Sequence, residues 1–240
     1  MINNGIKAVL FDLDGTLLPM DQDTFIASYM KHLSAYLVPY GYDPQKVIEG
    51  LWKGTGAMVK NDGSASNEEA FWRVFCAVIG KDARKDEPLF DKFYRTEFAN
   101  VQQSCGFDER ARQVIELVKS KNLRVALATN PLFPAIATKN RIRWAGLNPD
   151  DFELVTSYEN SRYCKPNPDY YREVIDKLGL EPEDCLMVGN DVAEDMITRE
   201  LGCDVFLLSD CLINKADKDI SIYSRGGFAE LLEYIRNVNE

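Results

Sequence analysis

An apolar run near the start of the chain stops at two carboxylates and a glycine, and this feature constrains the fold most. Residues 8–11 (Ala-Val-Leu-Phe) are followed by Asp12, Leu13, Asp14 and Gly15. In an extended strand the side chains alternate between faces, so we expect Asp12 and Asp14 to project together while Leu13 enters the core. Gly15 allows the chain to turn sharply. Because neighbouring carboxylates repel and raise each other's pKa, the pair indicates a bound cation.

The overall charge limits the partners that the chain can bind. With 38 acidic and 28 basic residues among 240, the formal net charge is −10. Nucleic acid and anionic membranes need a positive surface, so we expect neither as a partner. The hydrophobic fraction of 45% is ordinary for a globular protein, and no apolar run approaches the ~20 residues of a spanning helix. We therefore expect a cytoplasmic protein in which an anionic substrate needs locally placed cations.

Residue usage also restricts thiol and metal chemistry. The six cysteines form no CxxC pair, so we expect reduced structural thiols. His32 is the single histidine, and we interpret it as a helical surface or partly packed residue. Zinc sites built on histidine clusters and serine–histidine relays are therefore not expected.

Residues 21–103 lack strand patterns and are predicted to be helical. Helices are expected over 23–40, from Pro44 onward, over 68–79 and over 88–101, with a loop at 61–66. Pro44 suits the first turn of a helix, where its missing amide costs nothing. Asn67 is expected to cap the third helix through its side chain.

From residue 108 onward, predicted strands alternate with predicted helices. Strands are expected at 124–129, 152–155, 185–188 and 205–208, and helices at 108–121, 134–144, 168–178, 192–201 and 228–238. This alternation predicts an α/β fold, a Rossmann-like parallel sheet sandwiched by helices. Ligands of such sheets bind at the carboxyl ends of the strands, where the aspartate pair, Thr129 and Asn190–Asp191 are expected. The predicted domains are a core of residues 1–18 and 107–240 and an all-helical insert of residues 19–106.

Four motifs, in order, resemble those of the haloacid dehalogenase superfamily, whose members are mostly phosphatases. Asp12-Leu-Asp14-Gly15-Thr16 is similar to the first motif, and Thr129 after an apolar strand is similar to the second. Lys165 in Cys-Lys-Pro-Asn-Pro is similar to the third, and Gly189-Asn190-Asp191-Val-Ala-Glu-Asp195 to the fourth. The resemblance covers the predicted core, and the helical insert stands where many members carry a cap domain.

The resemblance implies a phosphatase that forms an aspartyl-phosphate. By this resemblance Asp12 is the nucleophile, and Asp14 protonates the leaving alcohol and then deprotonates the attacking water. Thr129 and the neighbouring Asn130 are expected to bind phosphate oxygens. Lys165 is expected to neutralise charge on the intermediate, because developing charge in phosphoryl transfer needs such donors.

The resemblance also implies a magnesium ion. Two like charges ~4 Å apart cost about 4 kcal/mol at an effective dielectric of about 20, and Mg²⁺ offsets this repulsion between phosphate and carboxylate. The family pattern gives Asp12 and the main-chain carbonyl of Asp14 as ligands. The third ligand is Asn190 or Asp191, because the family places an acid directly after the glycine where this chain has Asn190; we favour Asp191. Asp195, expected one helical turn further, is interpreted as orienting a bound water or Lys165.

The leading hypothesis is a magnesium-dependent phosphatase that acts on a small phosphorylated metabolite. Lys53 and Arg73 in the insert are candidate specificity residues, although helix packing and solvation explain them equally well. A phosphomutase would keep the same residues, and Asn190 raises the alternative of a catalytically weak binding or regulatory protein on this fold. A dehalogenase is not expected to keep Asp14 and the magnesium ligands. A monomer and a homodimer are both compatible with the sequence.

Overall fold

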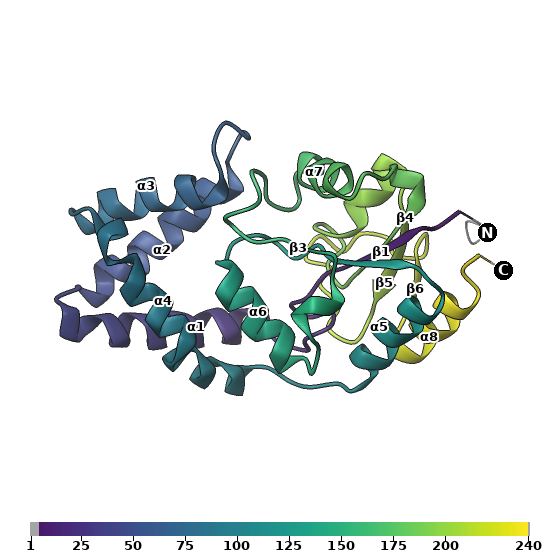
Figure 1. Cartoon of the computed structure of the whole chain (residues 1–240), viewed down its shortest axis with the longest axis horizontal. Helices are drawn as coiled ribbons and strands as arrows, with labels where there is room; N and C mark the ends of the chain where they lie inside the picture. The colour runs from purple at the N-terminus through teal and green to yellow at the C-terminus, as the bar shows by residue number, and fades with distance from the viewer. Residues whose placement is uncertain (1–4, 240) are drawn as a thin grey trace.

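The computed structural model describes residues 5–239, and its centre is a six-stranded parallel sheet with the order β3-β2-β1-β4-β5-β6 (Figure 1). All five pairings between neighbouring strands are parallel. The strands are β1 (Ala8–Phe11), β2 (Arg124–Leu127), β3 (Leu154–Val155), β4 (Cys185–Gly189), β5 (Asp204–Leu208) and β6 (Ser224–Gly226). The predicted α/β class is therefore confirmed.

Strand β1 lies in the middle of the sheet, and its four residues are all buried. Phe11, its last residue, lies opposite Leu127 of β2 and Val188 of β4. A central parallel strand is covered on both faces, which explains its uninterrupted apolar sequence. Because the three strands end in register, the residues that follow them meet at one edge of the sheet.

Helices cover both faces of the sheet, as predicted. Helices α5 (Arg110–Ser120) and α8 (Phe228–Arg236) lie on one face, and α7 (Pro168–Leu178) lies on the other (Figure 1). Alternate residues of the strands join two separate apolar clusters, Val9 and Phe11 with α5 and α8, and Leu10 with α7. This alternation follows from the twofold repeat of a strand.

A group of helices lies between β1 and α5, beside one end of the sheet (Figure 1). Its α-helices are α1 (Gln22–Leu37), α2 (Pro44–Val59), α3 (Asn67–Ile79) and α4 (Glu87–Arg95). Phe25 and Tyr29 of α1 pack edge-to-face on Phe133 of the segment after β2. The insert thus shares one apolar cluster with a face of the sheet. No helix in residues 5–239 is long and apolar enough to cross a membrane.

Several predicted helices and strands differ from the structure in detail. The predicted helix 88–101 ends at Arg95, and a 3-10 helix (Glu97–Ser104) follows it. The predicted helix 192–201 is only a 3-10 helix (Met196–Leu201) after a turn. Strand β6 was not predicted, since its sequence Ser-Arg-Gly is short, polar and partly exposed. Edge strands of this kind carry no apolar pattern to detect.

The predicted cap of α3 is also wrong by one residue. Ser66 is the N-cap, and its hydroxyl accepts the amide of Glu69 while the Glu69 carboxylate accepts the amide of Ser66. Asn67 is instead the first helical residue and is fully buried. Its side-chain amide donates to the carbonyl of Tyr163 at 3.0 Å, and its main-chain N–H donates to the carbonyl of Ser161 at 2.8 Å. Asn67 therefore fastens the insert to the loop that precedes α7.

We expect Asn67→Ala to lower the free energy of unfolding by about 1–3 kcal/mol, because it leaves a buried carbonyl without its donor. Urea unfolding followed by circular dichroism measures the change. The control is Asn100→Ala, which removes an exposed hydrogen bond to Glu97 and is expected to stay within about 0.5 kcal/mol of the parent. Equal stability of the two variants would contradict this role of Asn67.

Candidate active site

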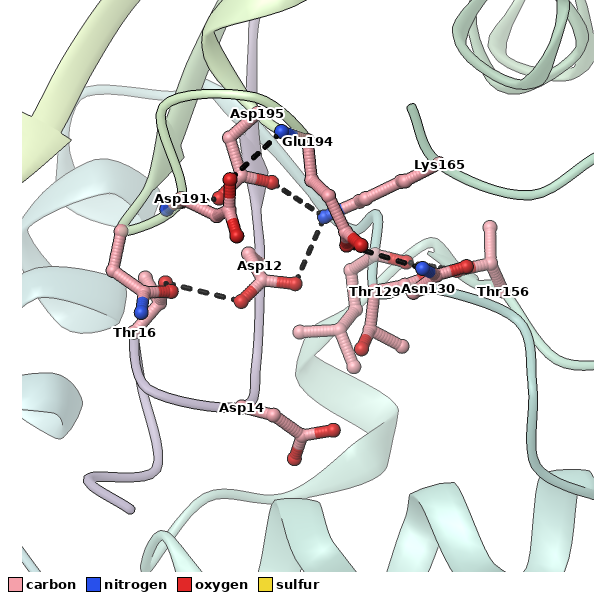
Figure 2. Close-up of polar contacts among 12 residues, drawn as sticks. Asp12, Asp14, Thr16, Thr129, Asn130, Thr156, Lys165, Asp191, Glu194 and Asp195 are labelled. Carbon is pink, nitrogen blue, oxygen red and sulfur yellow. Dashed lines mark hydrogen bonds and ion pairs between the residues drawn. The ribbon is translucent and has the colours of Figure 1, made fainter. Parts of the chain in front are cut away.

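Asp12 follows β1 at the carboxyl edge of the sheet and is held in place by three hydrogen bonds, of which Figure 2 shows the two made by its side chain. Its amide donates to the carbonyl of Val188 at 2.9 Å, which continues the pairing of β1 with β4. Its Oδ1 accepts from Nζ of Lys165 at 2.8 Å, and its Oδ2 accepts from the hydroxyl of Thr16 at 3.1 Å. With an exposed fraction of 7%, the carboxylate is fixed and shielded from bulk water.

The chain turns immediately after Asp12, so the predicted extended course through Asp14 is wrong. The carbonyl of Leu13 accepts the amides of Thr16 and Leu18 at 3.1 and 2.8 Å. Leu13 itself is fully buried, as predicted. Gly15 has a φ of 89°, and a Cβ there would lie 2.4 Å from Nδ2 of Asn190. The turn therefore needs glycine both for its backbone conformation and for space.

Lys165 joins the ends of β1 and β4 through two buried ion pairs. Its Nζ lies 2.8 Å from Oδ1 of Asp12 and 2.6 Å from Oδ1 of Asp195, and its side chain is 1% exposed. Burial disfavours the ammonium, but these carboxylates outweigh it and hold the pKa of Lys165 well above its ordinary value. Burial raises the pKa of Asp195, and Lys165 acts against that rise. The predicted proximity of these residues is confirmed by the geometry.

Asp14 is held by an arginine that sequence reasoning missed. Arg141 of α6 (Ala135–Trp144) forms an ion pair with Oδ2 of Asp14, and Arg141 is completely buried. Its guanidinium lies 4.4 Å from the ring centroid of Phe133. Burial raises the pKa of Asp14, although Arg141 acts in the opposite direction. The signal in the sequence was an arginine on the buried face of α6, beside Ala137 and Ile142.

Oδ1 of Asp14 is buried without a hydrogen-bond partner among the described residues. The same side chain lines a cavity of about 110 Å³, which we call the catalytic cavity. Asn130 and Glu194 also line it, and Nδ2 of Asn130 donates to the Glu194 carboxylate at 3.1 Å. Oδ1 of Asn130 is buried and unpartnered in the described chain. A cavity bordered by unsatisfied polar atoms is suited to a polar ligand.

Thr129 is placed at this edge by contacts that the sequence did not reveal. It follows β2, and its carbonyl accepts from the hydroxyls of Thr156 and Tyr170 at 2.7 and 2.8 Å. The hydroxyl of Tyr171 donates to the carbonyl of Glu194 at 2.8 Å. Helix α7 therefore stabilises both the second motif, at Thr129, and the fourth motif, at Glu194. The spacing of two adjacent tyrosines in a predicted amphipathic helix gave no sign of this role.

Asn190 and Asp191 use their side chains differently. Oδ1 of Asn190 accepts from Thr16 at 2.9 Å, and its Nδ2 donates to the carbonyl of Cys211 at 2.6 Å. Oδ1 of Asp191 accepts the amides of Ala193 and Glu194 at 2.7 and 3.0 Å. Within the described residues, Oδ2 of Asp191 has no protein partner. The free oxygen favours Asp191 over Asn190 as a ligand for a cation.

The charge and the donor atoms fit a divalent cation. Five carboxylates and two cations give a formal charge of −3, from Asp12, Asp14, Asp191, Glu194 and Asp195 against Lys165 and Arg141. In residues 5–239 no three His, Cys, Asp or Glu side chains form a closed metal site. A cation here would take few side-chain ligands and complete its shell with main-chain oxygen and water, which is the habit of Mg²⁺.

The structure does not bring Lys53 and Arg73 to this cluster. The Lys53 side chain is 59% exposed and pairs with Glu49 on the same helix at 2.6 Å. Arg73 is exposed on α3. Neither residue lines the catalytic cavity, so nothing in their placement supports the predicted contact with substrate.

We expect Lys165→Met to lower the free energy of unfolding by about 3–5 kcal/mol near neutral pH, because Asp12 and Asp195 then lack a counter-charge. Loss of the ammonium also removes the interaction that lowers the pKa of Asp195. A carboxyl whose pKa is raised in the folded state binds more protons there than when unfolded, so the deficit shrinks as the pH falls. Urea unfolding at neutral and mildly acidic pH measures both effects. The control is Lys53→Met, and a pH-independent loss would contradict the argument.

Comparison with known proteins agrees with this arrangement. A family model described as haloacid dehalogenase-like hydrolase matches residues 6–198. The chain is 28% identical to a phosphoglycolate phosphatase of Photorhabdus laumondii, over 83% of this chain and 78% of that protein. Two structures share the fold with 17% identity: a HAD phosphatase from Thermococcus onnurineus, with a TM-score of 0.60 and coverage of 98% and 100%, and a 2-haloacid dehalogenase from Pseudomonas syringae, with 0.61, 96% and 98%.

The family model spans the helical insert, the strands β1, β2 and β4 that precede three of the motifs, and the loop before α7 that carries Lys165. It therefore covers Asp12, Thr129, Lys165 and the turn at Asn190–Asp191. The chain belongs to the haloacid dehalogenase-like hydrolase family.

Proposed function

We propose that the protein is a magnesium-dependent phosphatase that hydrolyses a small phosphorylated metabolite through an aspartyl-phosphate on Asp12. The observation that carries this proposal is the Asp12 carboxylate, fixed between Lys165 and Thr16 at the carboxyl edge of the sheet. Family membership and the similarity to a protein named phosphoglycolate phosphatase support it. The identity of the metabolite is a separate question.

The first step is attack by an Asp12 oxygen on phosphorus. As the new P–O bond forms, the bond to the leaving oxygen breaks, and the carboxyl of Asp14 gives that oxygen a proton. Arg141 fixes one oxygen of Asp14, and the other has no hydrogen-bond partner in residues 5–239. Burial raises the pKa of Asp14, which favours the protonated form that this step needs.

The second step is hydrolysis of the acyl phosphate on Asp12. The Asp14 carboxylate takes a proton from water, the water oxygen bonds to phosphorus, and the bond between phosphorus and Asp12 breaks. Inorganic phosphate leaves, and both acids return to their starting states. Thr129, Asn130 and Lys165 would bind the phosphoryl oxygens, and Asp195 would keep Lys165 oriented.

Three groups would hold Mg²⁺: the Asp12 carboxylate, the main-chain carbonyl of Asp14 and the free oxygen of Asp191. When bound, the ion offsets the charge of the phosphoryl group and orients it. Asn190 is committed to Thr16 and Cys211 and would position the turn after β1. We further propose that the insert, residues 19–106, acts as a cap that shields the site from bulk water.

We expect Asp12→Asn to lower phosphate release from 4-nitrophenyl phosphate by about a thousandfold or more, because an amide cannot act as the nucleophile. Removal of divalent ions by chelation should abolish the parent's activity, and added Mg²⁺ should restore it. Asp23→Asn, on the exposed side of α1, is the control. Full activity after chelation would contradict the metal requirement. With a sugar phosphate, which carries further hydroxyls to receive the phosphoryl group, an isomeric phosphate ester in place of free phosphate would identify a phosphomutase.

We expect Asp191→Asn to weaken Mg²⁺ binding by about 10–100-fold, because the amide has one ligating oxygen, already used as a cap, and no charge. Isothermal titration calorimetry with Mg²⁺ and no substrate measures this. The comparison variant is Asn190→Ala, which removes the contacts to Thr16 and Cys211. The assignment of the ligand would be reversed if only Asn190→Ala weakened binding.

A further inference from the structure

A second cavity adjoins the catalytic cavity beneath the helical insert. This insert cavity has a volume of about 90 Å³ and lies among all four α-helices of the insert and the segments after β2 and β3. Its walls are mostly apolar, and nearly half of the lining residues are aromatic, including Tyr29, Trp52, Phe71, Trp72, Tyr94 and Tyr158.

The two cavities share part of their walls. Ile26, Leu132 and Phe133 line both of them. Ile26 lies on α1, and the other two follow Asn130 on the segment after β2. A phosphate ester whose leaving oxygen lies at Asp14 would therefore extend its organic part into the insert cavity. Engineered apolar cavities of about 150 Å³ bind benzene. The insert cavity of about 90 Å³ is smaller, so a ring would fill it and also part of the adjoining catalytic cavity of about 110 Å³.

The charges around this space are all negative. Among the described residues, no lysine, arginine or histidine lines either cavity. Glu87 and Asp91 of α4 line the insert cavity, whereas Asp14 and Glu194 line the catalytic cavity. Arg141, a nearby cation, is already paired with Asp14. An anionic leaving group would lose its hydration here and be repelled by the carboxylates that line the two cavities.

Two hydroxyls of the aromatic wall are engaged with one another, whereas Nε1 of Trp72 is buried without a hydrogen-bond partner among the described residues. The hydroxyls of Tyr29 and Tyr94 lie 2.8 Å apart and form a hydrogen bond. Burial raises the pKa of Tyr29 to about 12, so that hydroxyl stays neutral. The wall therefore offers mainly ring surface and dispersion contacts, with the Trp72 indole as one free donor, rather than the several polar partners that a hydroxyl-rich sugar needs.

We propose that the insert cavity is a leaving-group subsite selective for phosphate monoesters whose leaving group is uncharged and aromatic. This inference rests on the proposed function and deepens it. The proposed substrates differ from the one in the name of its relative, phosphoglycolate phosphatase, because a glycolate leaving group carries a carboxylate.

The test compares phenyl phosphate with 4-carboxyphenyl phosphate, which differ by one negative charge. We expect kcat/KM for the carboxylated ester to be lower by about tenfold or more, with phosphoglycolate lower still. The carboxylate substituent makes the phenol a slightly better leaving group, so a loss of rate reports binding rather than intrinsic reactivity. Phosphate release with Asp12→Asn as the blank gives both rates.

A variant that introduces a positive charge tests whether the leaving group binds in the insert cavity. Thr55, half-buried on α2, lines the insert cavity, and Thr55→Lys would place a cation there. We expect the ratio of kcat/KM for phenyl phosphate to kcat/KM for 4-carboxyphenyl phosphate to fall about tenfold or more. Gln45→Lys, an exposed change on the same helix, should leave the preference unchanged. If thermal melting shows that Thr55→Lys does not fold, Glu87→Gln provides the second variant, and removal of its charge should narrow the preference.

The outcomes separate the two proposals. If Asp12-dependent release occurs from neither aryl ester nor phosphoglycolate, the proposed function fails, and the subsite inference fails with it. If both aryl esters are hydrolysed equally, or if phosphoglycolate is the best substrate, only the subsite inference is overturned. A preference that responds to Gln45→Lys as strongly as to Thr55→Lys would also overturn it.

Discussion

The buried ammonium of Lys165 between the carboxylates of Asp12 and Asp195 is the interaction on which the site depends. Lys165 lies 153 positions after Asp12 and 30 positions before Asp195 in the chain, so the ammonium connects distant segments. One ammonium does not neutralise two carboxylates, so the pairing leaves negative charge in a region sealed from solvent. The excess negative charge suits a divalent cation, and the cation in turn suits a phosphate group. The ion pairs of Lys165 therefore both connect separate parts of the fold and prepare the site for ligand binding.

The second ion pair, between Asp14 and Arg141, serves a different purpose. Asp12 is fixed through both of its oxygens, whereas Asp14 is fixed through one and its other oxygen has no partner in the described part of the chain. The two aspartates of one motif are thus given unequal surroundings by different parts of the fold. Such inequality is what a division of labour between two carboxyl groups requires.

Much of this architecture could be predicted because the signals were local. The apolar run before Asp12 specified a central strand, and Pro44 and Gly179 marked helix ends that the structure confirms. Arg141 could not be predicted, because its meaning depends on α6 packing against the turn after β1. Strand β6 and the replacement of a predicted helix after Val192 by a turn depend on tertiary pairing, which a local pattern does not contain.

Phe133 lies at the junction of these features. One side of its ring contacts the guanidinium of Arg141, and the residue also borders both cavities. The side chain that packs on the guanidinium of Arg141 is therefore part of the wall that an organic group would touch. A substitution at this position would therefore alter the organic contact and the surroundings of the Asp14–Arg141 pair together, whereas Trp52 and Thr55 of α2 border the insert cavity alone.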